Sequence, residues 1–226
     1  MTSLHWELDD PRDHTTIAAN VRSLLGELAT TAAERRFPDR SELAGWHTRL
    51  YAGCRVPVPG YVGHFRGDRE VPELTDYEVG VGPDQPDGLP DKLGVWSADL
   101  GAELDRVLTG LHEALRWLDA RVPPGRRPST ADELQMVVEM AALVHGEWIR
   151  LHPFANGNGR TARVWVAFVC LRYRLPVFLV LKPRTPDLAY ARAARDSMGR
   201  PPDFTGNHTT TTAVFGHLLT LSLLTP

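Results

Sequence analysis

The chain has 226 residues, 42% of them hydrophobic and 23% charged, and its formal net charge is −3 at pH 7. This length and composition predict one buried core, as a single domain or a domain with an extension, and the presence of only two cysteines excludes a disulfide framework. The charges are interspersed, with no long basic run to follow a phosphate backbone, so nucleic acid is not the expected partner.

No segment has the pattern of an export signal or a membrane span. Residues 1–12 carry acids and lack the apolar stretch of a signal peptide. The most apolar stretch, residues 164–181, is interrupted by Arg172, Arg174 and Pro176, which argues against a membrane span. The sequence therefore predicts a cytoplasmic protein that makes no membrane contact.

An amphipathic helix is predicted before the main domain. Apolar residues recur every three or four positions over residues 15–36, and the Phe-Pro-Asp run at residues 37–39 ends the pattern. A second helix is predicted over residues 41–52. We therefore divide the chain into an N-terminal helical arm, residues 1–40, and a main domain, residues 41–226.

A β-hairpin is predicted within a long loop. Residues 56–88 are crowded with glycine and proline, and Tyr77, Val79 and Val81 recur at every second position. This loop either presents an unpaired strand edge, to which an extended segment of another protein can add, or is a mobile surface loop.

Helices dominate the rest of the chain, so the predicted fold class is mostly α. The clearest helix start is at Thr130, where Glu133 completes a capping box before an apolar stripe that ends near Leu151. The periodicity predicts further helices over residues 100–118, 160–173, 187–198 and 210–224.

A glycine-rich loop at residues 152–159 lies between two of these apolar helices. The backbone N–H groups of Gly157, Asn158 and Gly159 can point inward at the start of the following helix, a geometry that binds anions. His152 at the loop entrance can accept a proton from a hydroxyl group, because its ordinary pKa of about 6.5 is near neutral pH.

Arg160 and Arg163 lie three residues apart in the first turn of the following helix, so both are expected to project from one face. Cations in a first turn oppose the helix dipole, and such a departure from a local rule is typical of functional sites. A polyphosphate would compensate, because two guanidinium groups bind several of its oxygens. Each of these features has a structural explanation when it occurs alone: the glycine-rich loop can cap a helix, the histidine can be exposed, and the two arginines can form a solvated helix face. Their combination favours phosphoryl or nucleotidyl transfer.

Residues 152–163 read His-Pro-Phe-Ala-Asn-Gly-Asn-Gly-Arg-Thr-Ala-Arg. They resemble the Fic family motif, His-x-Phe-x-Asp/Glu-Gly-Asn-Gly-Arg-x-x-Arg, with one specified position unmatched. A looser similarity covers most of residues 41–200. The resemblance implies a Fic-type helical bundle with a small β-hairpin flap, in which residues 41–226 form the catalytic domain.

The resemblance also implies a reaction. AMP, or another nucleotide or phosphate-containing group, moves from a donor such as ATP to a Ser, Thr or Tyr hydroxyl of a target protein, with Mg²⁺ or Mn²⁺. By matched position, His152 is the general base and Phe154 is a buried anchor. The implied phosphate ligands are Gly157, Asn158 and Gly159 around the α-phosphate, with Arg160 and Arg163 on the β- and γ-phosphates.

The unmatched position is Asn156, where active members of the family usually have Asp or Glu to bind Mg²⁺. An amide oxygen can bind a hard metal ion but lacks the charge. The alternatives are therefore a weak metal site at Asn156, a different donor, or a non-catalytic module that binds a nucleotide or a protein. A toxin of a toxin–antitoxin pair that uses the same chemistry is a further alternative.

The arm at residues 1–40 is a possible inhibitory element. Many Fic proteins carry a helix with the pattern Ser/Thr-x-x-x-Glu-Gly/Asn, whose Glu pairs with the second motif arginine. Residues 30–34 fit this pattern with Glu34 as the acid, although Arg35 replaces Gly/Asn and residues 23–27 fit equally. The alternatives are that Glu34 is an ordinary exposed acid and that a separate antitoxin-like protein inhibits the site.

Two further side chains have open roles. Tyr190 is a candidate contact for the base of the nucleotide, because aromatic rings stack on bases, and the alternative is that it packs in the core. His145 lies two helical turns before His152, where a structural role is expected rather than a catalytic one.

Overall fold

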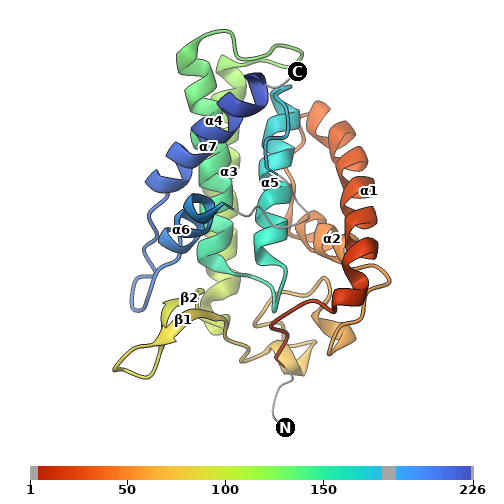
Figure 1. Cartoon of the computed structure of the whole chain (residues 1–226), viewed down its shortest axis with the longest axis vertical. Helices are drawn as coiled ribbons and strands as arrows, with labels where there is room; N and C mark the ends of the chain where they lie inside the picture. Colours follow the sequence, from red (N-terminus) through yellow and green to blue (C-terminus); the bar gives the residue numbers. More distant parts are fainter. Residues whose placement is uncertain (1–4, 180–186, 225–226) are drawn as a thin grey trace.

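The computed structural model describes residues 5–179 and 187–224, and within them the protein is mostly helical, as predicted (Figure 1). No helix in these described ranges is long and apolar enough to cross a membrane. The helices are α1 (His14–Ala33), α2 (Arg40–Leu50), α3 (Ser97–Arg121), α4 (Ala131–Leu151), α5 (Asn158–Arg172), α6 (Leu188–Asp196) and α7 (Thr209–Leu224), and the strands are β1 (Gly80–Asp84) and β2 (Pro90–Leu93).

Helix α5 lies at the centre of the bundle. Residues 164–170 are all fully buried, and a helix that is apolar around its circumference must be covered on every side. Helices α1 and α2 pack on one side of α5 and α4 on another, while α3 and α7 pack on α4 (Figure 1). The apolar stripe of α1, which includes Ile17, Leu24 and Leu28, is buried in this packing.

The start of α4 follows the predicted capping box. The Thr130 hydroxyl accepts a hydrogen bond from the backbone N–H of Glu133 at 3.1 Å. The Glu133 carboxylate accepts from the backbone N–H of Ser129 at 2.7 Å, one residue before the N-cap, and it also pairs with Arg126. Two N–H groups at the helix start therefore have acceptors, and the loop before α4 is tied to its first turn.

The hairpin is smaller than the sequence pattern indicates and begins later in the chain. Strand β1 is antiparallel to β2, with Gly80 opposite Leu93 and Val81 opposite Lys92. Tyr77 precedes the strand and is buried in the core. Among the described residues β1 pairs only with β2, and all of its residues are exposed. The hairpin therefore presents an open strand edge.

A single buried arginine caps the C-terminus of α4. The guanidinium group of Arg66 donates to the carbonyl oxygens of Leu151 and His152 at 3.0 and 2.7 Å. Carbonyl groups in the last turn of a helix have no partner within the helix, and a positive charge there also complements the helix dipole. Arg66 therefore holds the chain at the point where it leaves α4.

Arg66 also holds both ends of the hairpin segment. It donates to the carbonyl oxygens of Tyr77 and Val95 at 3.0 and 2.7 Å, and it pairs with Glu78 at 2.9 Å. Glu78 in turn accepts from the backbone N–H of Ser97, the first residue of α3, at 2.9 Å. One buried charge therefore connects the hairpin, the start of α3 and the end of α4.

Replacing Arg66 by methionine is expected to destabilise the fold, because several buried carbonyl groups lose their partner and Glu78 loses its ion pair. Arg66→Met should lower the free energy of unfolding, measured by urea denaturation, by about 3–5 kcal/mol. The control is Arg106→Met, since Arg106 pairs with Glu103 while 66% of its side chain is exposed, and such a pair contributes less than about 1 kcal/mol. Equal effects of the two substitutions would show that Arg66 does not connect these elements as described.

Candidate active site

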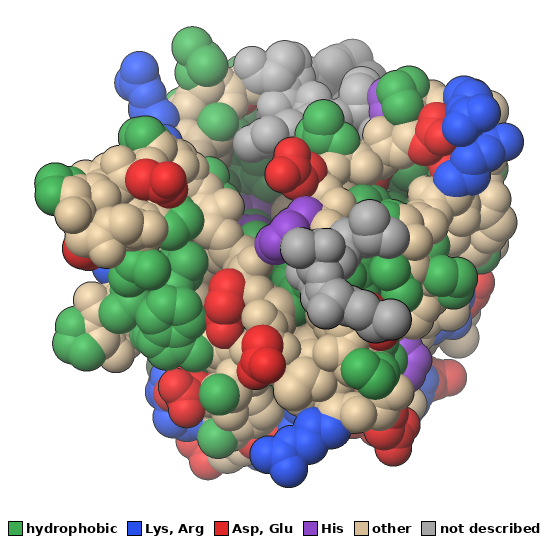
Figure 2. Space-filling view, turned by 90° about the horizontal axis from the view of Figure 1, so that it is seen from below, with side chains coloured by type: hydrophobic (Ala, Val, Ile, Leu, Met, Phe, Trp, Pro, Cys, Tyr) green, Lys and Arg blue, Asp and Glu red, His purple; other side chains and the backbone are tan. Residues whose placement is uncertain are grey.

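A cavity of about 710 Å³ opens at the end of the bundle where the motif loop, the hairpin and the N-terminal segment meet. Figure 2 shows this end, with a hollow near its centre bordered by histidine and acidic side chains. The volume lies in the range of small-molecule binding sites. Of the residues predicted from sequence, the cavity is lined by His152, Asn156, Gly157, Asn158, Gly159, Arg160, Arg163 and Tyr190, and Glu34 is not among them.

His152 lies at the end of α4 in a left-handed conformation, with φ of 49°. This conformation is uncommon for a residue other than glycine, and it often marks a functional position. The hairpin approaches closely at Gly94, because a Cβ atom there would lie 2.7 Å from the Cβ of His152. The hydrogen bond from Arg66 to the His152 carbonyl fixes this geometry.

The hydrogen bonds of His152 determine its tautomer. Nδ1 lies 2.7 Å from the carbonyl oxygen of Ile149, which can only accept, so Nδ1 carries the proton and Nε2 keeps a lone pair. Burial lowers the pKa of His152 to about 4, and the charge of Arg66 contributes to the lowering. The imidazole is therefore neutral at pH 7, and Nε2 can accept a proton from a hydroxyl group bound in the cavity.

The motif loop is cross-linked to the start of α5. The side chain of Asn158 accepts from the backbone N–H of Phe154 at 2.9 Å and donates to the Phe154 carbonyl at 2.8 Å. Phe154 is fully buried between the rings of His47 and Phe65, at centroid distances of 3.9 and 4.9 Å. Asn158 therefore uses its side chain to shape the loop, and its backbone N–H is the group that can bind an anion.

Asn156 does not offer the ligand that a resident metal ion needs. Its side-chain oxygen accepts from the N–H of Gly157 at 2.6 Å, and this contact distinguishes the two amide atoms because an N–H group can only donate. Its side-chain nitrogen is buried and has no hydrogen-bond partner among the described residues. No group of three or more His, Cys, Asp or Glu side chains that could hold a metal ion occurs in residues 5–179 and 187–224. These residues do not fit Mg²⁺ or Mn²⁺ at Asn156.

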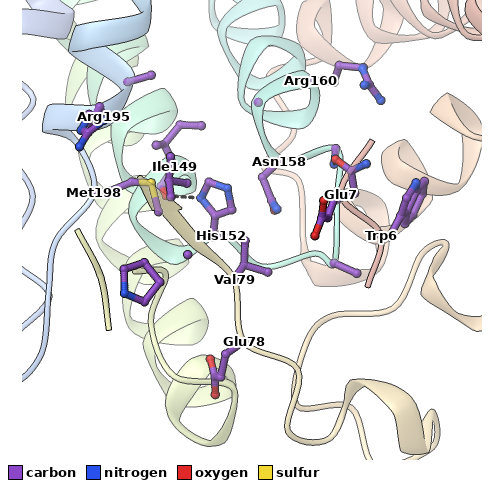
Figure 3. A pocket seen from close by; sticks show the side chains of 18 of the residues that line it. Trp6, Glu7, Glu78, Val79, Ile149, His152, Asn158, Arg160, Arg195 and Met198 are labelled. Atoms are coloured by element: carbon purple, nitrogen blue, oxygen red, sulfur yellow. Dashed lines mark hydrogen bonds between the residues drawn. The ribbon is translucent and has the colours of Figure 1, made fainter. Parts of the chain in front are cut away.

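Arg160 contacts the N-terminal segment. In Figure 3 its side chain points away from His152, on the side of the cavity where Trp6 and Glu7 lie. Its guanidinium group pairs with the carboxylate of Asp9 and donates to the hydroxyl of Tyr51. The side chains of Arg160 and Asp9 are only 13% and 9% exposed. A phosphate group that binds Arg160 must therefore compete with Asp9.

Trp6 anchors this N-terminal segment. It is 4% exposed, its ring lies 4.6 Å from that of Tyr51, and its backbone N–H donates to the hydroxyl of Tyr77 at 2.8 Å. Sequence reasoning missed Asp9 and Tyr51, because no local spacing links either residue to Arg160. The acids among residues 1–12 were the one available signal.

Arg163 contacts α6 instead. Its Nη1 lies 3.3 Å from the hydroxyl oxygen of Tyr190, which lies 2.9 Å from Nε2 of His145. All three side chains are buried. The sequence predicted that Arg160 and Arg163 project from one face. Both line the cavity, but their guanidinium groups contact different elements.

Glu34 is at the opposite end of α5 from the motif arginines. It ends α1 and pairs with Arg36, and 54% of its side chain is exposed. The carbonyl groups of Arg35 and Arg36 accept from Arg172 in the last turn of α5, roughly 13 Å along the helix from Arg163. The predicted pair between Glu34 and Arg163 is therefore not formed, because α1 runs alongside α5 and ends far from the cavity.

A family model supports the similarity seen in the motif. The model of the Fic/DOC family matches residues 37–170. That range contains the hairpin, the motif loop, Arg66 and both motif arginines. It leaves α1 and the segment that carries Asp9 outside the match.

Solved structures share the fold. A Fic domain containing signaling protein from Bacteroides thetaiotaomicron is 19% identical, with a TM-score of 0.61, over 92% of this chain and 70% of that chain. The N-terminal Fic domain of Bep8 from Bartonella sp. 1-1C is 16% identical, with a TM-score of 0.54, over 94% of this chain and 88% of that chain. The BepC protein from Bartonella tribocorum, solved with bound AMPPNP, is 16% identical, with a TM-score of 0.53, over 92% and 87%.

Buried histidines predict how stability depends on pH. Burial lowers the pKa of His47 and His145 to about 3 and that of His152 to about 4. The unfolded chain binds protons at these residues near pH 6.5, whereas the folded chain does not, so unfolding takes up protons below that pH. We expect the free energy of unfolding to fall as the pH decreases from about 6.5 toward 4, measured by urea denaturation at several pH values.

A comparison of variants isolates the contribution of one histidine. His152→Gln should reduce the proton uptake on unfolding by about one proton in this pH range, whatever its effect on stability itself. An unchanged pH dependence in His152→Gln would contradict the neutral state assigned to His152.

Proposed function

Because the chain belongs to the Fic/DOC family, which is known for nucleotide transfer to proteins, we propose that it transfers AMP from ATP to a hydroxyl side chain of a target protein. One observation carries the proposal. The neutral His152, with Nε2 as acceptor, lines the same cavity as Arg160, Arg163 and the start of α5. A general base beside a polyphosphate site is the arrangement that nucleotidyl transfer requires.

In the proposed reaction, Nε2 of His152 removes the proton from the target hydroxyl while the hydroxyl oxygen attacks the α-phosphorus of ATP. The new O–P bond forms, the bond from that phosphorus to the bridging oxygen breaks, and pyrophosphate leaves with the electron pair. Arg160 and Arg163 bind the charge that develops on the pyrophosphate. The backbone N–H groups of Asn158 and Gly159 bind the α-phosphate, as N–H groups at a helix start do.

We assign no step to Mg²⁺ or Mn²⁺, because Asn156 offers an uncharged oxygen in place of a carboxylate. The buried side-chain nitrogen of Asn156 is a donor, so its chemistry suits a phosphate oxygen rather than a cation. The choice of ATP as donor has support in the AMPPNP bound to BepC, which shares the fold. We also propose that the protein works in the cytoplasm, as its sequence predicts.

The target protein is proposed to bind along the hairpin. Strand β1 is exposed along its length, and Tyr77 to Val81 line the same cavity as His152. An extended segment of the target can add to the β1 edge through main-chain hydrogen bonds, which would fix the position of its hydroxyl group relative to Nε2. The acceptor is then a Ser, Thr or Tyr side chain in an extended segment.

The experiment for this function uses purified protein, α-labelled ATP and host lysate, with Mg²⁺, Mn²⁺ or EDTA. We expect a labelled protein band, and His152→Ala should reduce its rate of formation by at least about 100-fold, because general base catalysis contributes that much. His112→Ala, whose side chain contacts the carbonyl of Pro38 outside the cavity, is the matched control. If the protein binds ATP but no protein is labelled, the result would favour the non-catalytic module. If the protein neither binds ATP nor labels any protein, the proposal is rejected.

The arm at residues 1–40 is proposed to inhibit the site through Asp9 rather than Glu34. The carboxylate of Asp9 occupies the guanidinium group of Arg160, and the contact is largely shielded from water. Trp6 anchors the segment against Tyr51. ATP must displace Asp9 to reach Arg160, so the arm lowers the apparent affinity for the donor.

Asp9→Asn is expected to raise the affinity for ATP about fivefold or more, measured by isothermal titration calorimetry, since the charge that competes with phosphate is removed. Asp10→Asn is the matched control, because the neighbouring Asp10 pairs with the exposed Arg12. Equal ATP affinities of the two variants would contradict the inhibitory role of Asp9 and leave the transfer activity itself as a separate question.

A further inference from the structure

A buried hydrogen-bond chain starts at Arg163 in the cavity wall and ends in the core. Nη1 of Arg163 lies 3.3 Å from the hydroxyl oxygen of Tyr190, and this oxygen lies 2.9 Å from Nε2 of His145. The three residues are 5%, 2% and 0% exposed. They come from α5, α6 and α4, so the chain joins three helices around the cavity.

The direction of the hydrogen bond between Arg163 and Tyr190 follows from the chemistry of Arg163. A guanidinium group only donates, so the hydroxyl oxygen of Tyr190 accepts from it. Burial lowers the pKa of His145 to about 3, so the imidazole beside Tyr190 is neutral at pH 7. In the tautomer with its proton on Nδ1, Nε2 of His145 accepts the hydrogen of the Tyr190 hydroxyl. The chain therefore fixes the position of the Tyr190 hydroxyl beside Arg163.

Tyr190 lines the cavity, although only 2% of the residue is exposed. The ring of Tyr190 packs against that of His145 at a centroid distance of 5.5 Å and an angle of 63°, and Phe215 of α7 lies 5.2 Å from His145. Ser197, which follows α6, bonds to Thr211 of α7 at 3.1 Å and holds the two helices together. Stacking on a base needs an accessible ring face, so the base contact suggested by the sequence stays a prediction.

We propose that Tyr190 is a positioning residue whose hydroxyl orients Arg163 to bind the distal phosphates of the donor nucleotide. The proposal rests on the proposed function, because it assigns Arg163 to a nucleoside triphosphate. An arginine side chain loses conformational entropy when a ligand fixes it, and an arginine that is held in place before binding loses less. This gain applies only to ligands that reach Arg163, so Tyr190 favours a triphosphate over a monophosphate.

The hydroxyl of Tyr190 can stay in place when phosphate binds. The guanidinium group of Arg163 has five N–H donors, and Tyr190 needs one of them. Asp9 differs, because its carboxylate carries a charge that competes directly with phosphate for Arg160. The two motif arginines therefore contact different partners: Arg160 pairs with a carboxylate, and Arg163 donates to a neutral hydroxyl.

The test compares the dissociation constants of AMP, ADP and ATP for the full chain by isothermal titration calorimetry. Tyr190→Phe keeps the buried ring and removes only the hydroxyl. We expect it to weaken ATP binding about fivefold to tenfold and to leave AMP binding within about twofold of the wild type, because one hydrogen bond to a charged group is lost.

The matched control is Tyr173→Phe. Tyr173 is also fully buried, and its hydroxyl donates to Asp119 at 2.8 Å at the far end of α5. The substitution therefore removes a buried hydroxyl of the same kind at a distance from the cavity. It should change the thermal stability and leave all three dissociation constants as they are in the wild type.

The outcomes separate this inference from the function on which it rests. Unchanged ATP affinity in Tyr190→Phe overturns the role of Tyr190 and leaves nucleotide transfer standing. An equal loss for AMP, ADP and ATP overturns it too, since that result indicates a contact with the base or ribose, or a general disturbance of the site. If the wild-type chain binds none of the three nucleotides, the proposed function is rejected and the role of Tyr190 with it.

Discussion

The active end of this protein depends on the burial of one charge, the guanidinium group of Arg66. A buried charge is tolerated only when its hydrogen-bonding groups are satisfied, and Arg66 meets this condition with four backbone carbonyl groups and Glu78. Two of those carbonyls belong to Leu151 and His152, and the others flank the hairpin. The general base and the strand edge proposed to dock the target are therefore held by the same group, so their separation does not depend on flexible connections.

The second constraint is electrostatic and concerns the start of α5. Two arginines in a first turn oppose the helix dipole, and the structure stabilises each of them with a residue that is distant in sequence. Asp9, which lies 151 positions away, pairs with Arg160, and Tyr190 of α6 accepts a hydrogen bond from Arg163. The segment that carries Asp9 and helix α6 thereby each contact one motif arginine, and the family match at residues 37–170 includes neither of them.

Neutral contacts hold the motif loop in the cavity wall. His47 stacks on Phe154 and its Nε2 lies 3.1 Å from the carbonyl oxygen of Asn156, while Asn158 is bonded to both backbone groups of Phe154. With Asn in place of an acid at position 156, the loop offers hydrogen-bond donors to a ligand. Nε2 of His152 is an acceptor in this wall, and the carboxylates of Glu7 and Glu78 also line the cavity. Such a site suits a polyanion on one side and a hydroxyl donor on the other.

The amino-acid sequence by itself determined the helices, the capping box at Thr130 and the motif loop with His152 at its entrance, because helical periodicity, caps and glycine turns are set by neighbours within a few residues. It placed the short exposed hairpin less well, since four or five exposed residues carry little pattern. It offered Glu34 as a candidate partner of Arg163, and the structure does not form this pair, because a short sequence pattern does not show which ends of two helices lie together. It left Tyr190 open between a contact with the base and a place in the core. Only the tertiary structure decided that Asp9 reaches Arg160 and that Tyr190 supports Arg163, since those contacts depend on how the N-terminal segment and α6 pack around α5.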